Sequence, residues 1–541
     1  MRKNEIYSGI EMKQKLLAGI KKVSDAVTST LGAKGQTVII EKEFQVPHIT
    51  KDGVTVAKSI NLKDPIENMG AKLIKQSSEQ TNKEAGDGTT TSTLLAFEMI
   101  KEGYKLIQSG VNPQDIRKGI EKTVKTVLEK IKEASSEISS KEQMKEIALV
   151  SSNGDEEISE IVASAFADIG KSGIIMIENS PDETSYFKKE EGYSMESGII
   201  SQHFTTNKEK GEAILEDVDV LVIEGELTEV NSMSAMLSQC AQKGRRLAIF
   251  CDGASNEVMQ IFVENKMRGV LSVALIKTPG FGQSKSDILD DIAVMTGTRT
   301  YSKTLGDDFT QIRVENLGMA KKIVSSRDET TILKHPDVAP APIEERVAVL
   351  REGLDTNSQF SKRKLEERVA KLAGGIGIYY VGAIVESELK EKRDRVEDTI
   401  NSVRASLEEG VVCGGGCTLL KIANELEESD VELSNEERYG YSIIKKSLCK
   451  PFQKIISNAG LSAEVFMEDI IRSKFQKKYD VRKSRWLKWE DGEICDPTKV
   501  VRLTVAHSSS TAGVVLTSNH LVVFEEDFPS ADFLERSSGI V

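Results

Sequence analysis

The most informative run in the chain is Gly86-Asp87-Gly88-Thr89-Thr90-Thr91, and an apolar, helix-like segment follows it over residues 92–100. The glycines allow a tight turn and a close approach of the backbone to a ligand, and the threonines supply hydroxyl groups. The start of a helix adds unpaired N–H groups and the positive end of a dipole, which together bind phosphate. The run therefore predicts a phosphate site, although an ordinary loop with a threonine N-cap would read the same way.

Asp87 adds a carboxylate to this predicted phosphate site. Carboxylate oxygens are preferred ligands of Mg²⁺, which in nucleotide sites takes its remaining ligands from phosphates and water. We therefore expect Asp87 to hold a magnesium ion that also contacts the oxygens of a nucleotide.

The composition excludes several classes of protein. A chain of 541 residues predicts roughly three or four domains, and its net charge of −13 gives no global positive field to attract nucleic acid. No apolar run is long enough to span a bilayer, and the start lacks the hydrophobic core of a secretory signal. We expect an intracellular protein with neither a membrane nor a nucleic-acid partner.

The six cysteines are scattered along this acidic chain, a pattern that favours reduced thiols over a disulfide framework. Cys413 and Cys417 bracket three glycines, but neither a second pair nor a nearby histidine completes a zinc site. We expect them to be small buried residues. The five histidines form no cluster and the chain has no Gly-x-Ser-x-Gly elbow, so a hydrolase triad has little support.

Hydrophobic periodicity predicts helices at both ends of the chain and an α/β segment between them. The N-terminal block has two short strands, 37–40 and 47–50, beside a hairpin-type turn at 51–53, and helices at about 12–31, 66–85, 89–109, 113–134 and 141–150. The middle alternates apolar strands with helices; the strands are at 173–178, 218–223, 246–250, 270–276 and 322–324, and the helices at 229–243, 255–267 and 284–296. A further strand at 374–382 leads to helices from 386 to about 473. The predicted fold is multidomain α and α/β, with an α/β unit inserted between mainly helical segments.

Separated motifs over nearly the whole chain resemble those of group I chaperonins of the GroEL type, close to the mitochondrial 60-kDa members. They include Leu31-Gly32-Ala33-Lys34-Gly35, Lys51-Asp52-Gly53, Lys277-Thr278-Pro279-Gly280-Phe281-Gly282 and Asp496-Pro497-Thr498-Lys499-Val500. The others, in the family's order with these, lie at 67–71, 86–91, 367–375, 395–398 and 408–416.

The resemblance implies a division into three domains. The equatorial domain would comprise residues 1–134 and 410–541, the intermediate domain 135–190 and 376–409, and the inserted apical domain 191–375. It also implies an ATP-dependent chaperonin that captures non-native polypeptides on its apical domains and encloses them for folding. Its partners would be further copies in a heptameric ring, single or double, a small ring-shaped co-chaperonin and unfolded clients.

The resemblance assigns one set of residues to ATP and Mg²⁺, with Asp87 as the metal ligand, and allows a potassium ion near Thr30 and Lys51. The nucleotide set is Thr30, Leu31, Gly32, Ala33, Lys51, Asp87, Gly88, Thr89, Thr90, Thr91, Ser151, Gly415, Asp480 and Asp496. Two of them depart from the family: Ala33 replaces a proline, and Asp480-Val481-Arg482 replaces Asn-Ala-Ala near the base and ribose.

The resemblance also assigns the hydrolytic step. Asp398 falls where the family activates water, and Asp52 is a second candidate for the same polar cage. A carboxylate on a mobile helix can orient water toward the γ-phosphate only when the intermediate domain closes. ATP hydrolysis is then coupled to the conformation of the protein. Composition alone would make Asp398 a surface carboxylate and Asp52 a turn residue.

Hinges are expected at Gly192, Gly375 and Gly410, since glycine tolerates the rotations that a hinge requires. The family's proline between the equatorial and intermediate domains is replaced by Glu137.

The client and co-chaperonin surface is assigned to apical positions that the family keeps apolar and exposed. The counterparts are Ile199, Ser201, His203, Phe204, Ser234, Leu237, Met259, Val263 and Glu264. The polar residues reduce the apolar area, while Phe204, Leu237, Met259 and Val263 would keep a groove. The alternative, which suits most positions of 233–240, is the core face of a helix.

These departures keep a second hypothesis open: a diverged paralogue that binds polypeptides with weak or no ATP turnover. The basic and aromatic segment 474–489 could stack a base or bind RNA, or could be solvated charge beside packed tryptophans.

The sequences at 55–60, 416–420 and 457–460 resemble those of mitochondrial chaperonins more than those of bacterial ones. We therefore expect the protein in a mitochondrion or a mitochondrion-derived organelle, with the bacterial cytoplasm as the alternative.

Overall fold

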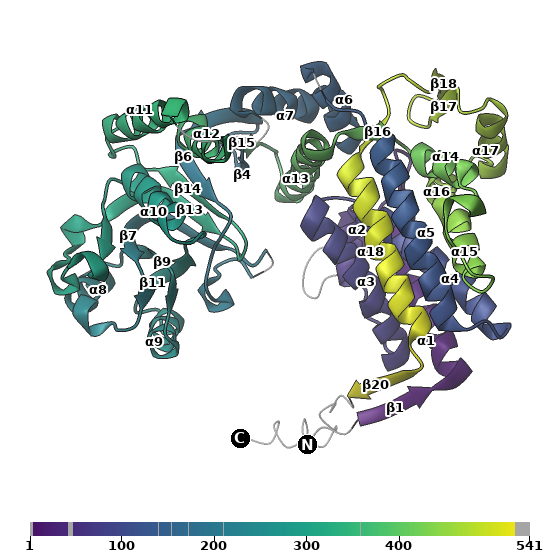
Figure 1. Ribbon diagram of the computed structural model, residues 1–541, viewed down its shortest axis with the longest axis horizontal. Helices are drawn as coiled ribbons and strands as arrows, with labels where there is room; N and C mark the ends of the chain where they lie inside the picture. Colours follow the sequence, from purple (N-terminus) through teal and green to yellow (C-terminus); the bar gives the residue numbers. More distant parts are fainter. Residues whose placement is uncertain are drawn as a thin grey trace. The chain divides into compact units, whose positions relative to one another are not determined.

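The structure is a computed structural model that describes residues 4–41, 47–138, 140–152, 154–170, 173–208, 210–356 and 359–524. The chain forms two compact units (Figure 1). The first combines Met1–Ser164 with Ile384–Val541, and the second is Ala165–Ala383. The first unit is therefore built from both ends of the chain, as the sequence predicted for its helical part.

The first unit is mainly helical. Its helices are α1 (Gly9–Thr28), α2 (Gly53–Ser59), α3 (Pro65–Ala85), α4 (Thr89–Gln108), α5 (Pro113–Glu133), α6 (Lys141–Ser151), α13 (Glu386–Glu409), α14 (Cys417–Glu425), α15 (Arg438–Leu448), α16 (Lys450–Asn458), α17 (Ala463–Arg472) and α18 (Thr498–Thr517), and α7 (Glu156–Ile169) crosses the boundary between the units. The core lies where α1, α3, α4, α5 and α18 pack together.

Small residues allow α1 and α3 to pack closely. A Cβ atom added to Gly19 would lie 1.9 Å from the carbonyl oxygen of Glu67, and one added to Gly70 would lie 2.3 Å from that of Leu16. Both distances are far below van der Waals contact, so a side chain at either position would push the helices apart.

Four antiparallel strand pairs complete the first unit. They are β1 (Asn4–Ser8) with β20 (His520–Phe524), β2 (Val38–Ile40) with β3 (His48–Thr50), β16 (Val411–Cys413) with β19 (Cys495–Pro497), and β17 (Lys477–Asp480) with β18 (Arg485–Lys488). The β1–β20 pair joins the two ends of the chain directly.

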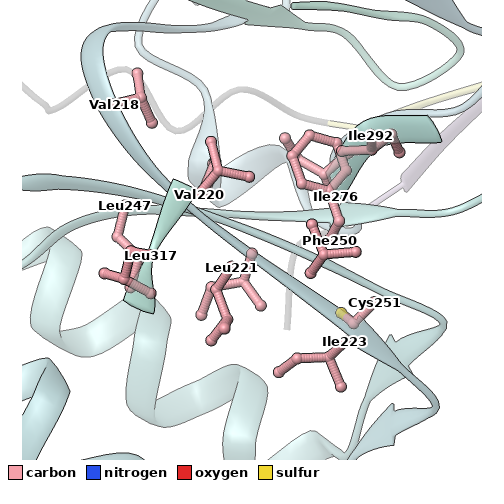
Figure 2. Packing of buried hydrophobic residues seen from close by; sticks show 14 of the residues in the cluster. Val218, Val220, Leu221, Ile223, Leu247, Phe250, Cys251, Ile276, Ile292 and Leu317 are labelled. Carbon is pink, nitrogen blue, oxygen red and sulfur yellow. The ribbon is translucent and has the colours of Figure 1, made fainter. Parts of the chain in front are cut away.

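The second unit is an α/β structure around a mixed seven-stranded sheet, ordered β11-β9-β7-β13-β14-β6 with β12 beside β7. These strands are β6 (Gly192–Met195), β7 (Ala213–Glu224), β9 (Arg246–Cys251), β11 (Ser272–Lys277), β12 (Thr300–Ser302), β13 (Gly318–Ser325) and β14 (Thr330–Lys334). Helices α8 (Ser234–Gln242), α9 (Asn256–Met267) and α10 (Gln283–Thr296) lie around this sheet (Figure 1). Figure 2 shows side chains of β7, β9 and β11 packed with Ile292 of α10 in a hydrophobic core.

A smaller sheet in the same unit has the order β4-β15-β5, from β4 (Ile175–Asn179), β5 (Tyr186–Glu190) and β15 (Ile376–Val381). The remaining strands and α-helices are the paired β8 (Glu226–Leu227) and β10 (Gly253–Ala254) and the helices α11 (Ala341–Thr356) and α12 (Gln359–Gly374).

Among the described residues, no helix has the length and apolar character needed to cross a bilayer.

The predicted pattern of helices and strands is confirmed for most of the chain, with one correction near the phosphate run. The segment Lys51-Asp52-Gly53 is not a hairpin turn, because α2 begins at Gly53 with Asp52 as its N-cap. The two strands flanking residues 42–46 do pair, and those five residues lie outside the described part of the chain.

A fully buried carboxylate ties α11 and α12 to α10 in the second unit. Asp291 accepts hydrogen bonds from Arg346 Nε at 3.0 Å and from Arg368 Nε and Nη2 at 2.8 and 2.7 Å. Because an ion pair broken from one side leaves uncompensated buried charge, this cluster is sensitive to loss of its carboxylate.

We predict that Asp291→Ala destabilises the second unit by about 3–5 kcal/mol, since two arginines lose their partner. Asp290→Ala is the matched control, because its side chain is 51% exposed and lies 3.8 Å from Arg346. Calorimetry and hydrogen exchange within β7 and β13 would measure both; equal stability of the two variants would contradict the prediction.

Candidate functional site

A cavity of about 340 Å³ in the first unit is lined by segments from both ends of the chain. This volume lies within the range of small-molecule sites. Every residue that the sequence assigned to nucleotide binding or water activation lines it, from Thr30 to Asp496. The structure thus brings together residues that are up to several hundred positions apart in sequence.

The N-terminus of α4 forms one wall of the cavity. Its N-cap, Gly88, has φ +92° and supplies no capping side chain, so the first N–H groups of the helix remain available. A Cβ at this position would also approach Thr504 and Val500 to 2.7 and 2.8 Å. The buried hydroxyl of Thr89 has no hydrogen-bond partner among the described residues. These donors fit an anion such as phosphate.

The turn at residues 30–33 forms the neighbouring wall, and Asn458 holds it from the C-terminal half of the chain. The Asn458 amide donates to the carbonyl oxygens of Thr28 and Leu31, both at 2.9 Å. The Thr30 hydroxyl donates to Val27 O at 2.8 Å, so it is fixed by the end of α1. The backbone of this turn therefore has a defined position at the cavity.

Asp52 is held as the N-cap of α2. Its Oδ1 accepts from Val54 N at 3.0 Å, and its Oδ2 accepts from the backbone N and hydroxyl of Thr55 at 2.8 and 2.6 Å. Both carboxylate oxygens are thus engaged locally, which suits positioning of the loop and a fixed negative charge better than proton transfer.

Asp398 reaches the cavity through a contact that the sequence did not reveal. One turn further along α13, Ser402 Oγ donates to Asp87 Oδ2 at 3.0 Å. Asn401 packs against Gly86, where a Cβ would lie 2.4 Å from the Asn401 Cβ. Because residues i and i+4 share a helix face, docking of Ser402 on Asp87 also turns Asp398 toward the α4 N-terminus.

The carboxylates of the cavity repel one another. Burial raises the pKa of Asp87, and burial together with the charges of Asp87 and Asp52 raises that of Asp398 well above its ordinary value. Burial and the charge of Asp87 raise the pKa of Asp496 to about 6. A bound cation would relieve this repulsion.

A metal would need ligands from outside the protein. Among the described residues, no group of three His, Cys, Asp or Glu side chains is arranged to hold a metal ion. An acidic cavity beside an anion site fits a cation that arrives with phosphate oxygens, which is how Mg²⁺ binds in nucleotide sites.

The far side of the cavity is formed by the β17–β18 hairpin. Asp480 Oδ1 accepts from the backbone N of Arg482 and Lys483 at 2.9 and 3.0 Å and so shapes the turn. Arg482 lines the cavity, and its guanidinium has no hydrogen bond or ion pair among the described residues. It is therefore a free donor at this end.

The tryptophans of this segment pack, as one of the two sequence interpretations expected. Trp486 stacks on Phe466 with ring centroids 5.5 Å apart, and Lys477 lies 4.0 Å from the Trp486 centroid. Lys483 and Arg485 both pair with Glu493, so part of the basic charge is neutralised within the hairpin.

Comparison with known proteins identifies the family. The model of the TCP-1/cpn60 chaperonin family matches residues 23–526. This chain belongs to that family. Two crystal forms of the chaperonin gp146 from the bacteriophage EL 2 (Pseudomonas aeruginosa), solved in the presence of ATP-BeFx, are similar in fold. The TM-scores are 0.71 and 0.63 at 21% and 20% identity, and both matches cover 96% of this chain and 99% of gp146.

Membership of a chaperonin family supports a chaperone role, and the predicted multidomain α and α/β fold is confirmed. The group I resemblance is consistent with both findings.

Three side chains expected on the client surface of this chaperonin are instead part of its core. Phe204, Ile199 and Leu237 are 0%, 5% and 9% exposed. Ile199 bridges to Ile276 at the sheet, and Phe204 lies under Lys266 of α9, whose Nζ is 5.7 Å from the ring centroid. The expectation that Phe204 and Leu237 line an exposed groove is therefore wrong.

The other predicted positions are more accessible. Met259 and Val263 are half-buried against the core, Ser201 is half-buried, and His203, Ser234 and Glu264 are exposed. Sequence reasoning missed several strongly exposed apolar residues of the second unit, among them Ile261 at 44%, Met267 at 76% and Phe281 at 94%. The first two lie on α9, where Met267 is opposite the buried Val258 and Ile261 is at the edge of the buried face, so helical position could have indicated the exposure of Met267 alone.

The three predicted hinge glycines have distinct local reasons. Gly375 and Gly410 have φ +73° and +79°, which favours glycine. Gly192 lies in a strand, where a Cβ would be 2.4 Å from Ile376 Cδ1 and 2.5 Å from Ile332 O. Close packing therefore accounts for Gly192, and a hinge role at all three stays a prediction.

We predict that Asp496→Asn stabilises the nucleotide-free chaperonin at pH 7.5. The raised pKa means that the charged carboxylate costs stability above about pH 6, and this cost disappears as the pH falls toward the ordinary value of 3.8. The gain should therefore be at most about 3 kcal/mol at neutral pH and vanish near pH 4.

Thermal unfolding of the variant between pH 4 and 8 would measure this gain. Asp25→Asn, at a side chain 58% exposed on α1, is the control. A gain that is the same at every pH would contradict the assignment of the raised pKa to Asp496.

Proposed function

We propose that this chain is an ATP-dependent chaperonin in which the cavity of the first unit binds and hydrolyses magnesium-ATP. The observation that carries the proposal is the meeting of the uncapped α4 N-terminus with Asp87 and Asp398 in one cavity. Donors for phosphate, a carboxylate for a metal and a second carboxylate for water are what phosphoryl transfer requires.

Each group has a definite task in this proposal. The N–H groups and hydroxyls of Thr89, Thr90 and Thr91 bind phosphate oxygens, and the partnerless Thr89 hydroxyl gains an acceptor. Asp87 would hold Mg²⁺, which neutralises charge on the phosphates when bound. The exposed Lys51 adds a positive charge at the rim, near the place where the resemblance allows potassium.

Asp398 would orient the attacking water and accept its proton. Its raised pKa in the free protein reflects burial and neighbouring carboxylates, so a bound cation would lower it and favour the charged form. Since Asp398 and the Ser402 anchor share α13, any movement of this helix away from Asp87 would withdraw Asp398 as well. Hydrolysis would then depend on the position of α13.

The assembly is proposed from family membership. The chain would form a homo-oligomeric heptameric ring, single or double, with equatorial, intermediate and apical domains, a small ring-shaped co-chaperonin and unfolded polypeptides as clients. Ile261 and Met267 of α9 supply exposed apolar surface for a non-native chain.

A second candidate function is polypeptide binding with weak or no ATP turnover. The observation in its favour is the apical surface, where Ser234, His203 and Glu264 are exposed and Phe204 is buried. Steady-state ATPase with and without co-chaperonin separates the two, because only a cycling chaperonin would change its turnover when the co-chaperonin is added.

We predict that Asp398→Ala keeps magnesium-dependent ATP binding and slows turnover at least tenfold, since proton acceptance contributes on this scale. Asp394→Ala, one turn earlier on the same helix and outside the cavity lining, is the control. Calorimetric titration and single-turnover hydrolysis measure the two effects. Unchanged turnover in Asp398→Ala would remove this carboxylate from the mechanism.

We also predict that Arg482→Ala weakens nucleotide binding by about tenfold to a hundredfold, the loss of roughly one hydrogen bond to a charged donor. Lys488→Ala, exposed on the same hairpin and outside the cavity, is the control. Titration with ATP and with ADP reports both affinities; tighter binding by Arg482→Ala would instead mark this arginine as an obstruction.

A further inference from the structure

Three of the six cysteines meet beside the cavity. Cys413 ends β16, Cys495 begins β19, and Cys417 begins α14 after three glycines. Cys413 and Cys495 are paired across the two strands and both line the cavity. Cys417 is buried, and its thiol is close enough to Cys413 to lower the pKa of Cys413.

The strand pairing places Cys413 and Cys495 at a position suited to a covalent link. Backbone hydrogen bonds join Gly414 N to Ile494 O and Thr498 N to Gly410 O, both at 3.0 Å. Because such bonds alternate along an antiparallel pair, the intervening Cys413–Cys495 pair is of the non-hydrogen-bonded type, with Cα atoms about 4.5 Å apart. This spacing is within the range of disulfides.

Cys413 is also the thiol with the strongest thiolate character. The hydrogen bond with Cys417 and the nearby Lys478 ammonium lower its pKa, while burial raises the pKa of Cys495 to about 11. Lys478 is held in place, since its buried Nζ donates to the carbonyl oxygens of Asp491 and Ile494. A thiol with a lowered pKa thus lies next to a thiol with a raised pKa, the arrangement of a reactive and resolving pair.

We propose that Cys413 and Cys495 form a reversible disulfide at the edge of the cavity when a peroxide reaches it. Cys413 first loses its thiol proton, and the thiolate then attacks one peroxide oxygen. The O–O bond breaks, a sulfenic acid forms, and the departing hydroxide takes up the proton released by Cys413 and becomes water. The Cys495 sulfur then attacks the sulfenic sulfur, the S–O bond breaks, and the Cys495 proton leaves with the hydroxide as water. Two thiols and one H₂O₂ therefore give one disulfide and two waters, and exchange with a dithiol reverses the step.

The disulfide would act on groups that line the cavity. Gly415 and Gly416, which lie two and three residues after Cys413, line the cavity, and so does Asp496, the residue after Cys495. The link would fix this loop against β19. A nucleotide in the cavity would cover both thiols, so oxidation would be fastest in the empty state; this last step rests on the proposed function.

The test exposes the full chain to hydrogen peroxide, quenches it with an alkylating agent and identifies cross-linked peptides by mass spectrometry before and after a dithiol. We expect a Cys413–Cys495 peptide that the dithiol removes. Cys240 and Cys251 are internal controls, because both are 0% exposed and burial raises their pKa to about 11 and about 12. A Cys413–Cys417 peptide instead, or oxidation no faster at Cys413 than at the two controls, would overturn the proposal.

Variants and nucleotide separate the disulfide from the function proposed above. Cys495→Ser should leave Cys413 as a sulfenic acid that a dimedone probe labels, whereas Cys417→Ser should still form the disulfide. Magnesium-ATP should slow formation of the disulfide at least fivefold in the wild-type chain. A disulfide that forms equally fast with magnesium-ATP would count against nucleotide in this cavity, while absence of the disulfide in nucleotide-free protein would count against the thiol proposal alone.

Discussion

The hydrogen bond from Ser402 to Asp87 is the contact on which the candidate site depends. It joins α13, from the C-terminal half of the chain, to the loop before α4, from the N-terminal half. Two ion pairs hold the end of the same helix on α18: Arg502 binds Glu409 with two nitrogens, and Lys499 binds Glu408. Removing α13 from this position would leave the anion site intact and take away the second carboxylate.

The same arrangement explains why the cavity is acidic in spite of its anion site. Asp87, Asp398 and Asp496 are brought together by contacts that also bury them, so their charge is costly until a cation enters. A site of this kind binds a metal–phosphate complex better than either component alone. The metal ion offsets the negative charge of the carboxylates, and the phosphate offsets the positive end of the α4 helix dipole. In the proposed function, catalysis and ligand selection would therefore rest on the same unfavourable electrostatics.

The sequence predicted the elements and the residue types of the site, and it failed where tertiary packing decides. The run at 86–91 was identified because glycine and helix-start chemistry are local. Asp52 was mistaken for a turn residue because an N-cap and a turn use the same side chain, and only the helix after it distinguishes them. Phe204 was placed on the surface because burial of one aromatic residue in a short 3₁₀ turn depends on α9, far along the chain.

The cysteines beside the cavity are a second case in which the sequence alone did not predict the tertiary contact. Spacing in sequence drew attention to Cys413 and Cys417, yet the partner at the matching strand position is Cys495, 82 residues further along the chain from Cys413. Strand register, which depends on the pairing of β16 with β19, makes this a close pair. The same pairing sets Asp496 beside the glycine loop, so a change in the register of β19 would displace a carboxylate and a thiol together. The place of Asp496 in the acidic cavity and the approach of the two thiols at its edge are therefore consequences of one strand pairing.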